Sequence, residues 1–520
     1  MIQVETFPFE KDKFEQLKNF HYGLDWPVVY IQENGHEMYI GETTDVYTRS
    51  KQHIADPDRA RLKKIHIITD EEFNKSANLD LEALLIQYIS AEGKYKLQNG
   101  NEGLINHNYY DKPKYRAKFE SLWEYLKGLN LVNESLEAIR NSDFFKFSPY
   151  KALTEDQLII AQILEKSIEV GNIKTHIVNG GPGTGKSVLA LYLLKRLKDG
   201  NPDLKIALVI SMTSLRSTLQ RVVKRIPGLG SETVIGPSDV IKEKYDLLIV
   251  DEAHRLRRRV NLANFGSYDA LNRAQGFDKD ATQLDWIVRS SKQQILFYDK
   301  NQTVVPADVR EEDFQLLNAE HYYLTSQMRV QGGEDYLKFI DDLFELKKTH
   351  FDSPKKYEFE IFSDIGKMID EIKKKNHEHS LSRVVAGYAW PWTTKKGKGE
   401  FDIEIDGVRL LWNSKNIDWV NSGNSINEVG CIHTIQGYDL NYVAVIIGPE
   451  LSYDERRKKL IVEEEKYKDI NGKRSISDPA ELERYVINIY KTLLTRGIKG
   501  TYIYIVDEKL RKKFRELITA

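Results

Sequence analysis

The sequence has little of what would place it in several large protein classes. It contains one cysteine, Cys431, in 520 residues, which excludes a disulfide within the chain and any zinc or iron–sulfur site built from several thiolates. No apolar run approaches the roughly 18 residues of a membrane span, and the first residues lack the basic start and apolar core of a signal peptide. We therefore expect a cytoplasmic protein with no membrane partner, whose metals are held by oxygen or imidazole.

The chain also lacks a strong charge of either sign. Its 76 Lys and Arg residues and 78 Asp and Glu residues give a formal net charge of −2. Net charge therefore does not indicate a nucleic-acid binder, although a local basic groove would be averaged away in this number. With 41% hydrophobic and 30% charged residues, the composition is that of a globular protein, and the length predicts about three domains.

A glycine-rich stretch at residues 180–187, GGPGTGKS, is the strongest motif. It follows an apolar run at 176–178 that predicts a strand and precedes a helical pattern at 188–194, which is the context of a phosphate-binding loop. The glycines let backbone N–H groups point at the phosphates of a nucleotide. Lys186 would reach the terminal phosphates and Ser187 would hold Mg²⁺. A glycine-rich surface turn is the alternative, which the complete pattern disfavours.

The N-terminal part shows a hairpin pattern. Strand-like runs at 28–32 and 37–41 flank Asn34-Gly35, and a two-residue turn there would put Tyr30 directly opposite Tyr39. Paired tyrosines on a hairpin are by themselves more often packing than chemistry.

Polar residues follow at helical spacing. Thr43 or Thr44 would cap a helix that carries Arg49 and His53 on one side. A later helical stripe of apolar residues has Glu82 at its edge, where a solvated glutamate is the ordinary alternative.

This part resembles the GIY-YIG nuclease family, with Val29-Tyr30 in place of the first motif and Tyr39-Ile40-Gly41 matching the second. Val28 and Val29 depart from the family's Gly and Ile. The resemblance implies a small mixed α/β domain that cleaves phosphodiesters with one divalent metal, Mg²⁺ or Mn²⁺. It also implies that Tyr30 and Tyr39 orient or activate water and that Arg49 steadies phosphate charge. By the same resemblance His53 is a polar helper, Glu82 binds the metal, and Asn99 or Asn101 completes the site.

Strand and helix patterns alternate from residue 149 to the end, which predicts parallel sheets covered on both faces. One apolar run ends in Asp251-Glu252. Because a carboxylate at the end of a buried strand is costly without a cation, Asp251 would meet the Mg²⁺ of the nucleotide, and Glu252 would polarise the attacking water.

Residues 149–520 resemble superfamily 1 helicases, most closely the Schlafen-type helicase-like ATPases. The resemblance implies two RecA-like lobes, ATP with Mg²⁺, and arginine fingers at Arg329 and Arg496. It implies an adenine reader at Gln157, although an ordinary helix start explains that residue equally well. It also implies a γ-phosphate sensor at Gln302. Tyr298, shortly before this sensor, stands where related helicases usually have a small residue. The nucleotide-site residues are then Gln157, Gly180, Gly183, Gly185, Lys186, Ser187, Asp251, Gln302, Gln436 and Gly437.

Basic segments at 255–259, 395–398 and 456–459 would either touch phosphate or be solvated loops. Trp390 and Trp392 would either stack on bases or pack in a core.

The expected fold is α/β: a small mixed GIY-YIG domain followed by two RecA-like doubly wound parallel-sheet lobes. The expected boundaries are 1–112 for the nuclease domain, 113–148 for a helical connector, and 149–325 and 326–520 for the lobes.

The first functional hypothesis is an ATP-dependent nuclease. A helicase-like motor would bind or move along nucleic acid, DNA in preference to RNA, and present it to the phosphodiesterase, a combination that suits defence against foreign DNA. The alternatives are a nucleotide-gated nuclease without translocation and a scaffolding ATPase with an inactive nuclease fold. The intact tyrosine, arginine and glutamate set argues against the last. The sequence leaves a homo-oligomer open.

Overall fold

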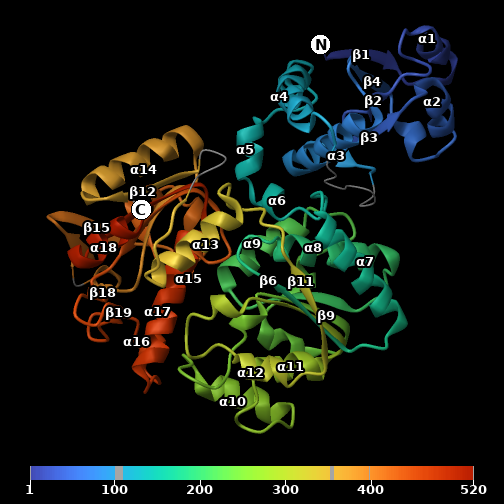
Figure 1. Cartoon of the computed structure of the whole chain (residues 1–520). Coiled ribbons are helices and arrows are strands. Elements are labelled where there is room, and N and C mark those ends of the chain that lie inside the picture. Colours follow the sequence, from blue (N-terminus) through green and yellow to red (C-terminus); the bar gives the residue numbers. More distant parts are fainter. Residues whose placement is uncertain (1, 100–108, 352–356, 398, 519–520) are drawn as a thin grey trace. The chain divides into compact units, whose positions relative to one another are not determined.

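The computed structural model describes residues 2–99, 109–351, 357–397 and 399–518 (Figure 1). By its contacts the chain divides into two compact units, residues 1–162 with 191–196 and residues 163–190 with 197–520. The first contains one sheet, and the second contains two large sheets and a small hairpin. No helix in the described ranges has the length and apolar character needed to cross a membrane.

The N-terminal unit is built on a five-stranded sheet in the order β1-β4-β2-β3-β5. Neighbouring strands are antiparallel except β3 and β5, which run parallel. The central strand β2 is buried along its whole length. The strands are β1 Gln3–Pro8, β2 Val28–Glu33, β3 Glu37–Thr43, β4 Lys64–Thr69 and β5 Lys96–Leu97.

The helices of this unit include those of the expected connector. α3 begins at Asn74, whose side chain accepts the N–H of Ala77, and ends at Gly93 in a left-handed conformation, two signals that bound a helix. The connector helix α4 is tied to α3 by Arg116, which donates to Asp80 at 3.2 Å. The helices are α1 Phe14–Asn19, α2 Val46–Ile54, α3 Lys75–Glu92, α4 Lys112–Gly128, α5 Leu136–Asn141 and α6 Asp143–Lys146, with the 3-10 turns η1 Lys11–Lys13 and η2 Arg59–Arg61.

The β2–β3 hairpin turns one residue later than the sequence predicts. Tyr30 pairs with Gly41 and Gln32 with Tyr39, so the prediction of Tyr30 directly opposite Tyr39 is wrong. Gly35 has the only positive φ in the turn, +86°, which makes it the first of the two turn residues. The partner of Tyr30 moves by two residues, and because side chains alternate with a period of two, both tyrosines still share one face as diagonal neighbours.

The cap of α2 also differs from the prediction. Asp45 is the N-cap in place of Thr43 or Thr44, and its carboxylate accepts the N–H of Thr48 at 2.8 Å. Thr43 Oγ1 accepts the N–H of Asp45 at 3.1 Å, so the threonine supports the cap. Asp is at least as favourable at this position as Thr.

The first large sheet of the second unit has six strands, all parallel, in the order β11-β6-β10-β9-β7-β8. The apolar run expected at 176–178 lies in β6, and the run that ends in Asp251-Glu252 lies in β9. The strands are β6 Thr175–Gly180, β7 Ile206–Ile210, β8 Val234–Ile235, β9 Tyr245–Asp251, β10 Ser291–Tyr298 and β11 Ala319–Leu324. The helices of this region are α7 Glu155–Val170, α8 Lys186–Gly200, α9 Thr213–Val223, α10 Phe265–Ala274, α11 Gln283–Ser290 and α12 Glu311–Gln315.

The second large sheet has the order β12-β20-β17-β13-β16-β15-β14 and is parallel except for the antiparallel edge strand β14. Its strands are β12 Glu358–Phe362, β13 Ser382–Ala386, β14 Ile403–Ile405, β15 Val408–Trp412, β16 Glu428–Gly430, β17 Leu440–Ile447 and β20 Gly497–Ile505, beside a hairpin of β18 Leu451–Asp454 and β19 Lys459–Val462. Its helices are α13 Gly333–Phe344, α14 Ile365–His379, α15 Ile432–Ile435, α16 Ile470–Lys473, α17 Pro479–Leu494 and α18 Glu508–Ile518.

Strand β17 shows how this second sheet is covered on both faces. Its odd-numbered residues from Val443 to Ile447 belong to an apolar cluster with α17 and α18, and its even-numbered residues from Tyr442 to Ile446 belong to a cluster with α14 (Figure 1). A strand buried on both sides reads as a continuous apolar run, which is why the sequence reveals it.

Candidate functional site

The phosphate-binding loop lies between the end of β6 and the start of α8. Gly183 and Gly185 both have a φ of +80°, a conformation that a side chain would strain. Lys186 is buried, and its Nζ donates to the carbonyl oxygens of Gly180 and Gly181 at 2.7 and 2.9 Å. The ammonium therefore lies within the loop, where the terminal phosphates of a nucleotide would replace these carbonyls as its partners.

Ser187 and Asp251 meet beside the loop. Ser187 Oγ donates to Asp251 Oδ2 at 2.6 Å, and Asp251, at the end of β9, is 1% exposed. Burial and the neighbouring Glu252 raise the pKa of Asp251 above its usual range. A carboxylate in these surroundings is stabilised by a cation, so the pair fits the Mg²⁺ that accompanies a nucleotide.

Glu252 is held in an uncommon backbone conformation, with φ +52° and ψ +49°, which costs about 1 kcal/mol or more for a residue with a side chain. Its Oε2 lies 3.1 Å from Nε2 of the fully buried His254. His254 Nδ1 accepts the backbone N–H of Asp299 at 3.3 Å, and burial lowers the pKa of His254 to about 3. Neutral His254 therefore carries its proton on Nε2, facing Glu252.

Side chains after β10 connect the loop to the second lobe, the part of the second unit that is built on the sheet from β12 to β20. Asp299 lies 3.7 Å from Lys186 Nζ and accepts from Gln302 Nε2 at 2.6 Å. Gln302 Oε1 accepts from Arg496 at 3.2 Å. Arg496 is 1% exposed, and burial together with repulsion from Arg329 lowers its pKa to about 10. Two of its guanidinium nitrogens have no hydrogen-bond partner, which an anion such as phosphate would supply.

Arg329 approaches the loop from the segment between the two lobes. A Cβ added at Gly183 would come within 2.8 Å of the Arg329 Cβ, so only glycine allows this approach. Gln327 donates Nε2 to Pro182 O at 2.6 Å, and Arg329 Nε lies 2.5 Å from Asp439 Oδ1. The structure thus brings both expected arginine fingers, one from each end of the second lobe, to the surroundings of the loop.

A polar cleft of about 440 Å³ opens between the lobes. One wall is formed by residues 211–216 at the start of α9 and by residues 236–239, and the other includes His433 and Gln436. Free N–H groups at a helix start and several hydroxyls suit phosphate oxygens. Gln436 is buried, and neither polar atom of its side chain has a hydrogen-bond partner. Gly437, with a φ of +89°, turns the chain directly after it.

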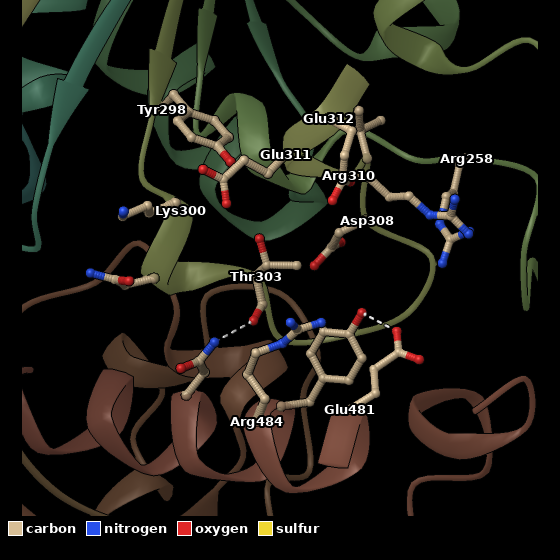
Figure 2. A pocket seen from close by; sticks show the side chains of 14 residues that line it. Arg258, Tyr298, Lys300, Thr303, Asp308, Arg310, Glu311, Glu312, Glu481 and Arg484 are labelled. Carbon is tan, nitrogen blue, oxygen red and sulfur yellow. Dashed lines mark hydrogen bonds between the residues drawn. The ribbon is translucent and has the colours of Figure 1, made fainter. Parts of the chain in front are cut away.

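A larger cleft of about 600 Å³ lies between the segment after β10 and α17 (Figure 2). In Figure 2, Arg258 and Arg310 lie together on one side, and Arg484 and Glu481 project from α17. Since its lining has equal numbers of cationic and anionic side chains, this cleft shows no preference for phosphate. The charged lining residues are Arg258, Lys300, Arg310, Arg484, Asp308, Glu311, Glu312 and Glu481.

The basic segment at 255–259 is largely paired within the protein. Arg255 and Arg257 lie 2.6 and 2.8 Å from the two oxygens of Asp308, and Arg259 lies 2.5 Å from Asp269. These pairs stabilise the loop after β9, and Arg255 and Arg257 also line the polar cleft.

The tryptophans and the last basic segment that were expected to contact nucleic acid have partners within the protein. Trp390 and Trp392 are half-buried against the core of the second lobe, which favours packing. Arg456 and Arg457 lie in the exposed turn between β18 and β19, where both backbone N–H groups donate to Asp454.

Gln157, the expected adenine reader, belongs to the N-terminal unit. It is buried, and its Oε1 accepts the backbone N–H of Thr154 at 3.1 Å, the bond of a helix-start residue.

In the N-terminal unit, the rings of Tyr30 and Tyr39 lie side by side, with centroids 6.1 Å apart. A Cβ added at Gly41 would lie 2.4 Å from Tyr30 Oη, so the glycine of the second motif is needed because the phenol crosses it. Burial and the neighbouring Tyr39 raise the pKa of Tyr30 well above its usual value. Tyr30 is therefore a neutral phenol.

Arg49 and Glu82 reach this site from two helices. Burial lowers the pKa of Arg49, but interaction with the phenols of Tyr30 and Tyr39 outweighs this effect and raises it. Burial and repulsion from Glu42 raise the pKa of Glu82 to about 7. Within the described residues, no three His, Cys, Asp or Glu side chains could hold a metal by themselves, so a metal at Glu82 would need oxygens of water or phosphate.

His53 lies against both tyrosines and is buried. Arg59 NH1 lies 2.8 Å from His53 Nε2, and because a guanidinium only donates, Nε2 must accept. Nδ1 then donates to Gln32 Oε1 at 2.9 Å. Burial, with the charges of Arg59 and Arg49, lowers the pKa of His53 to about 3. His53 is neutral and both its nitrogens are engaged, so it positions its neighbours.

Asn99 pairs with the backbone of the second motif. Ile40 N donates to Asn99 Oδ1 at 3.0 Å, and Asn99 Nδ2 donates to Ile40 O at 2.7 Å. Its amide therefore extends the sheet beside Tyr39. Asn101 lies outside the described residues.

Comparison with known proteins identifies the second unit. The model of the family "Schlafen group 3, DNA/RNA helicase domain" matches residues 174–507, more than half of the chain. The chain belongs to this family. An uncharacterized protein of Saccharomyces cerevisiae is 26% identical over 388 residues, which cover 65% of this chain and 83% of that protein.

Solved Pif1 helicases are distant neighbours of the Schlafen-group chain. The Pif1 helicase from Bacteroides in complex with ADP-AlF3 and ssDNA has 12% identity and a TM-score of 0.30, covering 69% of this chain and 94% of its own. The Pif1 helicase from Candida albicans has 11% identity and a TM-score of 0.28, covering 70% and 98%. At these scores the likeness adds nothing further about this chain.

Three residues at these sites were missed by sequence reasoning. Asp299, beside Lys186 in the Schlafen-group domain, had a usable signal, since it follows a buried strand as Asp251 does. Asp439, beside Arg329, lies in an irregular segment, and Arg59, beside His53, lies in a single 3-10 turn, so neither stands in a periodic pattern. Only the tertiary contacts reveal them.

Proposed function

We propose that this protein is an ATP-driven nuclease in which the Schlafen-group helicase domain binds or moves along nucleic acid, DNA in preference to RNA, and a GIY-YIG domain cuts it. The observation that carries the proposal is the gathering of Tyr30, Tyr39, Arg49 and Glu82 in one place. A packing hairpin needs neither an arginine at its phenols nor a half-buried glutamate with a raised pKa. The proposed parts are residues 1–112, 113–148, 149–325 and 326–520.

Hydrolysis of ATP would use residues of both lobes. Lys186 would neutralise the terminal phosphates, and Glu252 would polarise the attacking water. Arg329 and Arg496 would offset the charge that develops on the transferred phosphoryl group. Bound Mg²⁺ would supply further charge neutralisation beside the loop.

The polar cleft supports coupling of nucleic acid to the nucleotide. Gln436 lines the cleft, and Asp439, three residues later, pairs with Arg329. Between them, Tyr438 Oη lies 2.9 and 3.0 Å from the hydroxyls of Ser214 and Thr218 on α9. A strand that enters the cleft would press on a turn that is bonded to both lobes, and movement of this turn would move Arg329.

The nuclease chemistry follows from the protonation states. Neutral Tyr30 would orient the attacking water and could not take its proton, and His53 has no free nitrogen. Tyr39, whose ring lies beside that of Tyr30, would help to orient the same water. The proton of the water would pass to solvent as its oxygen bonds to phosphorus, and the leaving oxygen, released as its own bond to phosphorus breaks, would take a proton from solvent. Arg49 would balance charge on the phosphate, and Glu82 would hold a divalent metal that lowers this charge further.

The deciding experiment incubates the full chain with linear and plasmid DNA, and with RNA, in Mg²⁺ with and without ATP. Lys186→Ala serves as the motor control, because loss of its ammonium removes the main cation of the loop. We expect cleavage by the wild type that depends on ATP and fails in Lys186→Ala. Wild-type protein that cuts no substrate would disprove the nuclease proposal.

A nucleotide-gated switch without translocation is the second candidate, favoured by the contacts of Gln327 and Arg329 on the loop, which a nucleotide would displace. Glu252→Gln should bind ATP without hydrolysing it. A switch would then still cut along a long substrate, whereas a translocating nuclease would lose cuts far from its loading point. Mapping the cuts of both proteins decides between them. Either mechanism would suit the proposed defence against foreign DNA.

A further inference from the structure

Arg59 is a second arginine at the N-terminal site, contributed by η2 and not by the helix that carries Arg49. Its guanidinium lies over the ring of Tyr39, 4.0 Å from the ring centroid. Its NH1 donates to His53 Nε2 at 2.8 Å. A ring face on one side and an acceptor at one edge fix the plane of a guanidinium, so this group is held rigidly.

Arg59 has no carboxylate partner. Within the described ranges no Asp or Glu oxygen lies within 4.0 Å of its guanidinium, whereas Arg61, on the same 3-10 turn, lies 2.8 Å from Asp58 and 3.5 Å from Glu37. Asp56 is close in sequence, but its Oδ1 accepts backbone N–H groups, including that of Arg59 itself at 3.4 Å. Asp56 therefore compensates the charge of Arg59 only from a distance, and no carboxylate of the described residues forms an ion pair with its guanidinium.

Most N–H groups of Arg59 are also unused. Apart from NH1 to His53, its side chain makes no hydrogen bond to any described residue. The side chain is half-buried, and none of its nitrogens belongs to the buried, unpartnered atoms of the described residues, so its remaining donors face solvent. An arginine that served only to hold His53 would need neither the stacking on Tyr39 nor a free set of donors. These donors are therefore open to an anion that comes from outside the chain.

We propose that Arg59 binds a phosphate of the nucleic acid that flanks the scissile phosphate, and so holds the strand across Tyr39. This inference rests on the proposed nuclease function. Arg49 interacts with the phenols that would handle the attacking water, which assigns the reacting phosphate to Arg49. Arg59 instead lies on the ring face of Tyr39, and this position gives it no part in handling the water. The planar fork of its donors matches two phosphate oxygens. Arg59 should therefore act on binding more than on the chemical step.

The test measures cleavage of a short labelled DNA duplex by the full chain in Mg²⁺ and ATP over a range of salt concentrations. Arg59→Ala should raise KM about tenfold while kcat stays within about threefold, because one charge-assisted phosphate contact is lost. The slope of log(kcat/KM) against log salt should become shallower by about one unit. Arg59→Lys should restore the slope but only part of the KM, because an ammonium lacks the fork. Arg61→Ala, the matched control, should behave as the wild type.

An unchanged salt slope in Arg59→Ala would overturn the inference. So would a loss confined to kcat with a lower Tm, because an arginine that merely positions His53 affects geometry and stability without changing the number of phosphate contacts. If wild-type protein does not cleave the duplex, the nuclease proposal itself fails, and this inference falls with it. The wild-type series therefore separates the two failures.

Discussion

Asp439 Oδ1 lies 2.5 Å from Nε of Arg329, in an ion pair whose side chains are only 28% and 17% exposed. Arg329 is packed against the phosphate-binding loop at Gly183. Asp439 follows the turn that lines the polar cleft. In the proposed mechanism the carboxylate would therefore compete with the phosphates of a nucleotide for the same guanidinium.

Asp439→Asn should tighten the binding of ATP about fivefold, because an ion pair worth about 1 kcal/mol no longer competes for Arg329. Titration with a fluorescent ATP analogue measures the change in Kd. Asp341→Asn is the control, since it removes an ion pair with Lys491 in which Asp341 is 57% exposed, and its Kd should equal that of the wild type. Weaker binding by Asp439→Asn would show that Asp439 organises Arg329 and does not restrain it.

Arg329→Ala and Arg496→Ala should each lower kcat for ATP hydrolysis about 100-fold to 1000-fold, with Kd for ATP changed much less, because arginine fingers act chiefly on transition-state charge. Steady-state hydrolysis and nucleotide titration separate the two quantities. Arg409→Ala, which loses only an exposed pair with Glu404, should match the wild type. An unchanged kcat in both finger variants would mean that the lobes do not share one nucleotide site.

Glu82→Gln should reduce DNA cleavage about 100-fold or more while ATP hydrolysis persists, since the amide keeps the shape of the side chain but loses its metal-binding charge. Burial raises the pKa of Glu82 to about 7, so loss of this charge should not lower the Tm at pH 8. Glu124→Gln on the exposed face of α4 is the control. Undiminished cleavage by Glu82→Gln would remove Glu82 from the proposed site.

Glu450→Gln should stabilise the protein at high pH. Glu450 is fully buried, and burial raises the pKa of its carboxyl to about 7 from an ordinary 4.5, so the folded protein prefers the protonated form. Stability is then complete below pH 4.5 and decreases as pH rises to 7, by on the order of 3 kcal/mol. Tyr490 Oη donates to its Oε1, a bond that glutamine keeps.

Thermal unfolding at pH 5 and pH 8 checks this expectation. The difference in Tm between Glu450→Gln and wild type should be larger at pH 8, whereas the exposed control Glu465→Gln should show no such pH dependence. A constant difference across this range would mean that Glu450 stays ionised in the fold.

The strands that the sequence reveals are the buried ones. β7, β9 and β17 are continuous apolar runs, because neighbours cover both their faces. The edge strand β1 has mixed exposure and was not predicted, and neither were β11 and β12 at the edges of the large sheets. An edge strand has one neighbour and fewer buried positions, so its sequence carries little periodicity.

The candidate sites divide in the same way. The sequence by itself determined the phosphate-binding loop and the carboxylates of Asp251 and Glu252, because each lies within a few consecutive residues next to a buried strand. The tertiary structure alone decided the register that makes Tyr30 cross Gly41, and the partners that Asp439 and Arg59 find. A pairing between segments distant in the chain depends on how sheets and turns close in space, and single-residue patterns do not encode it.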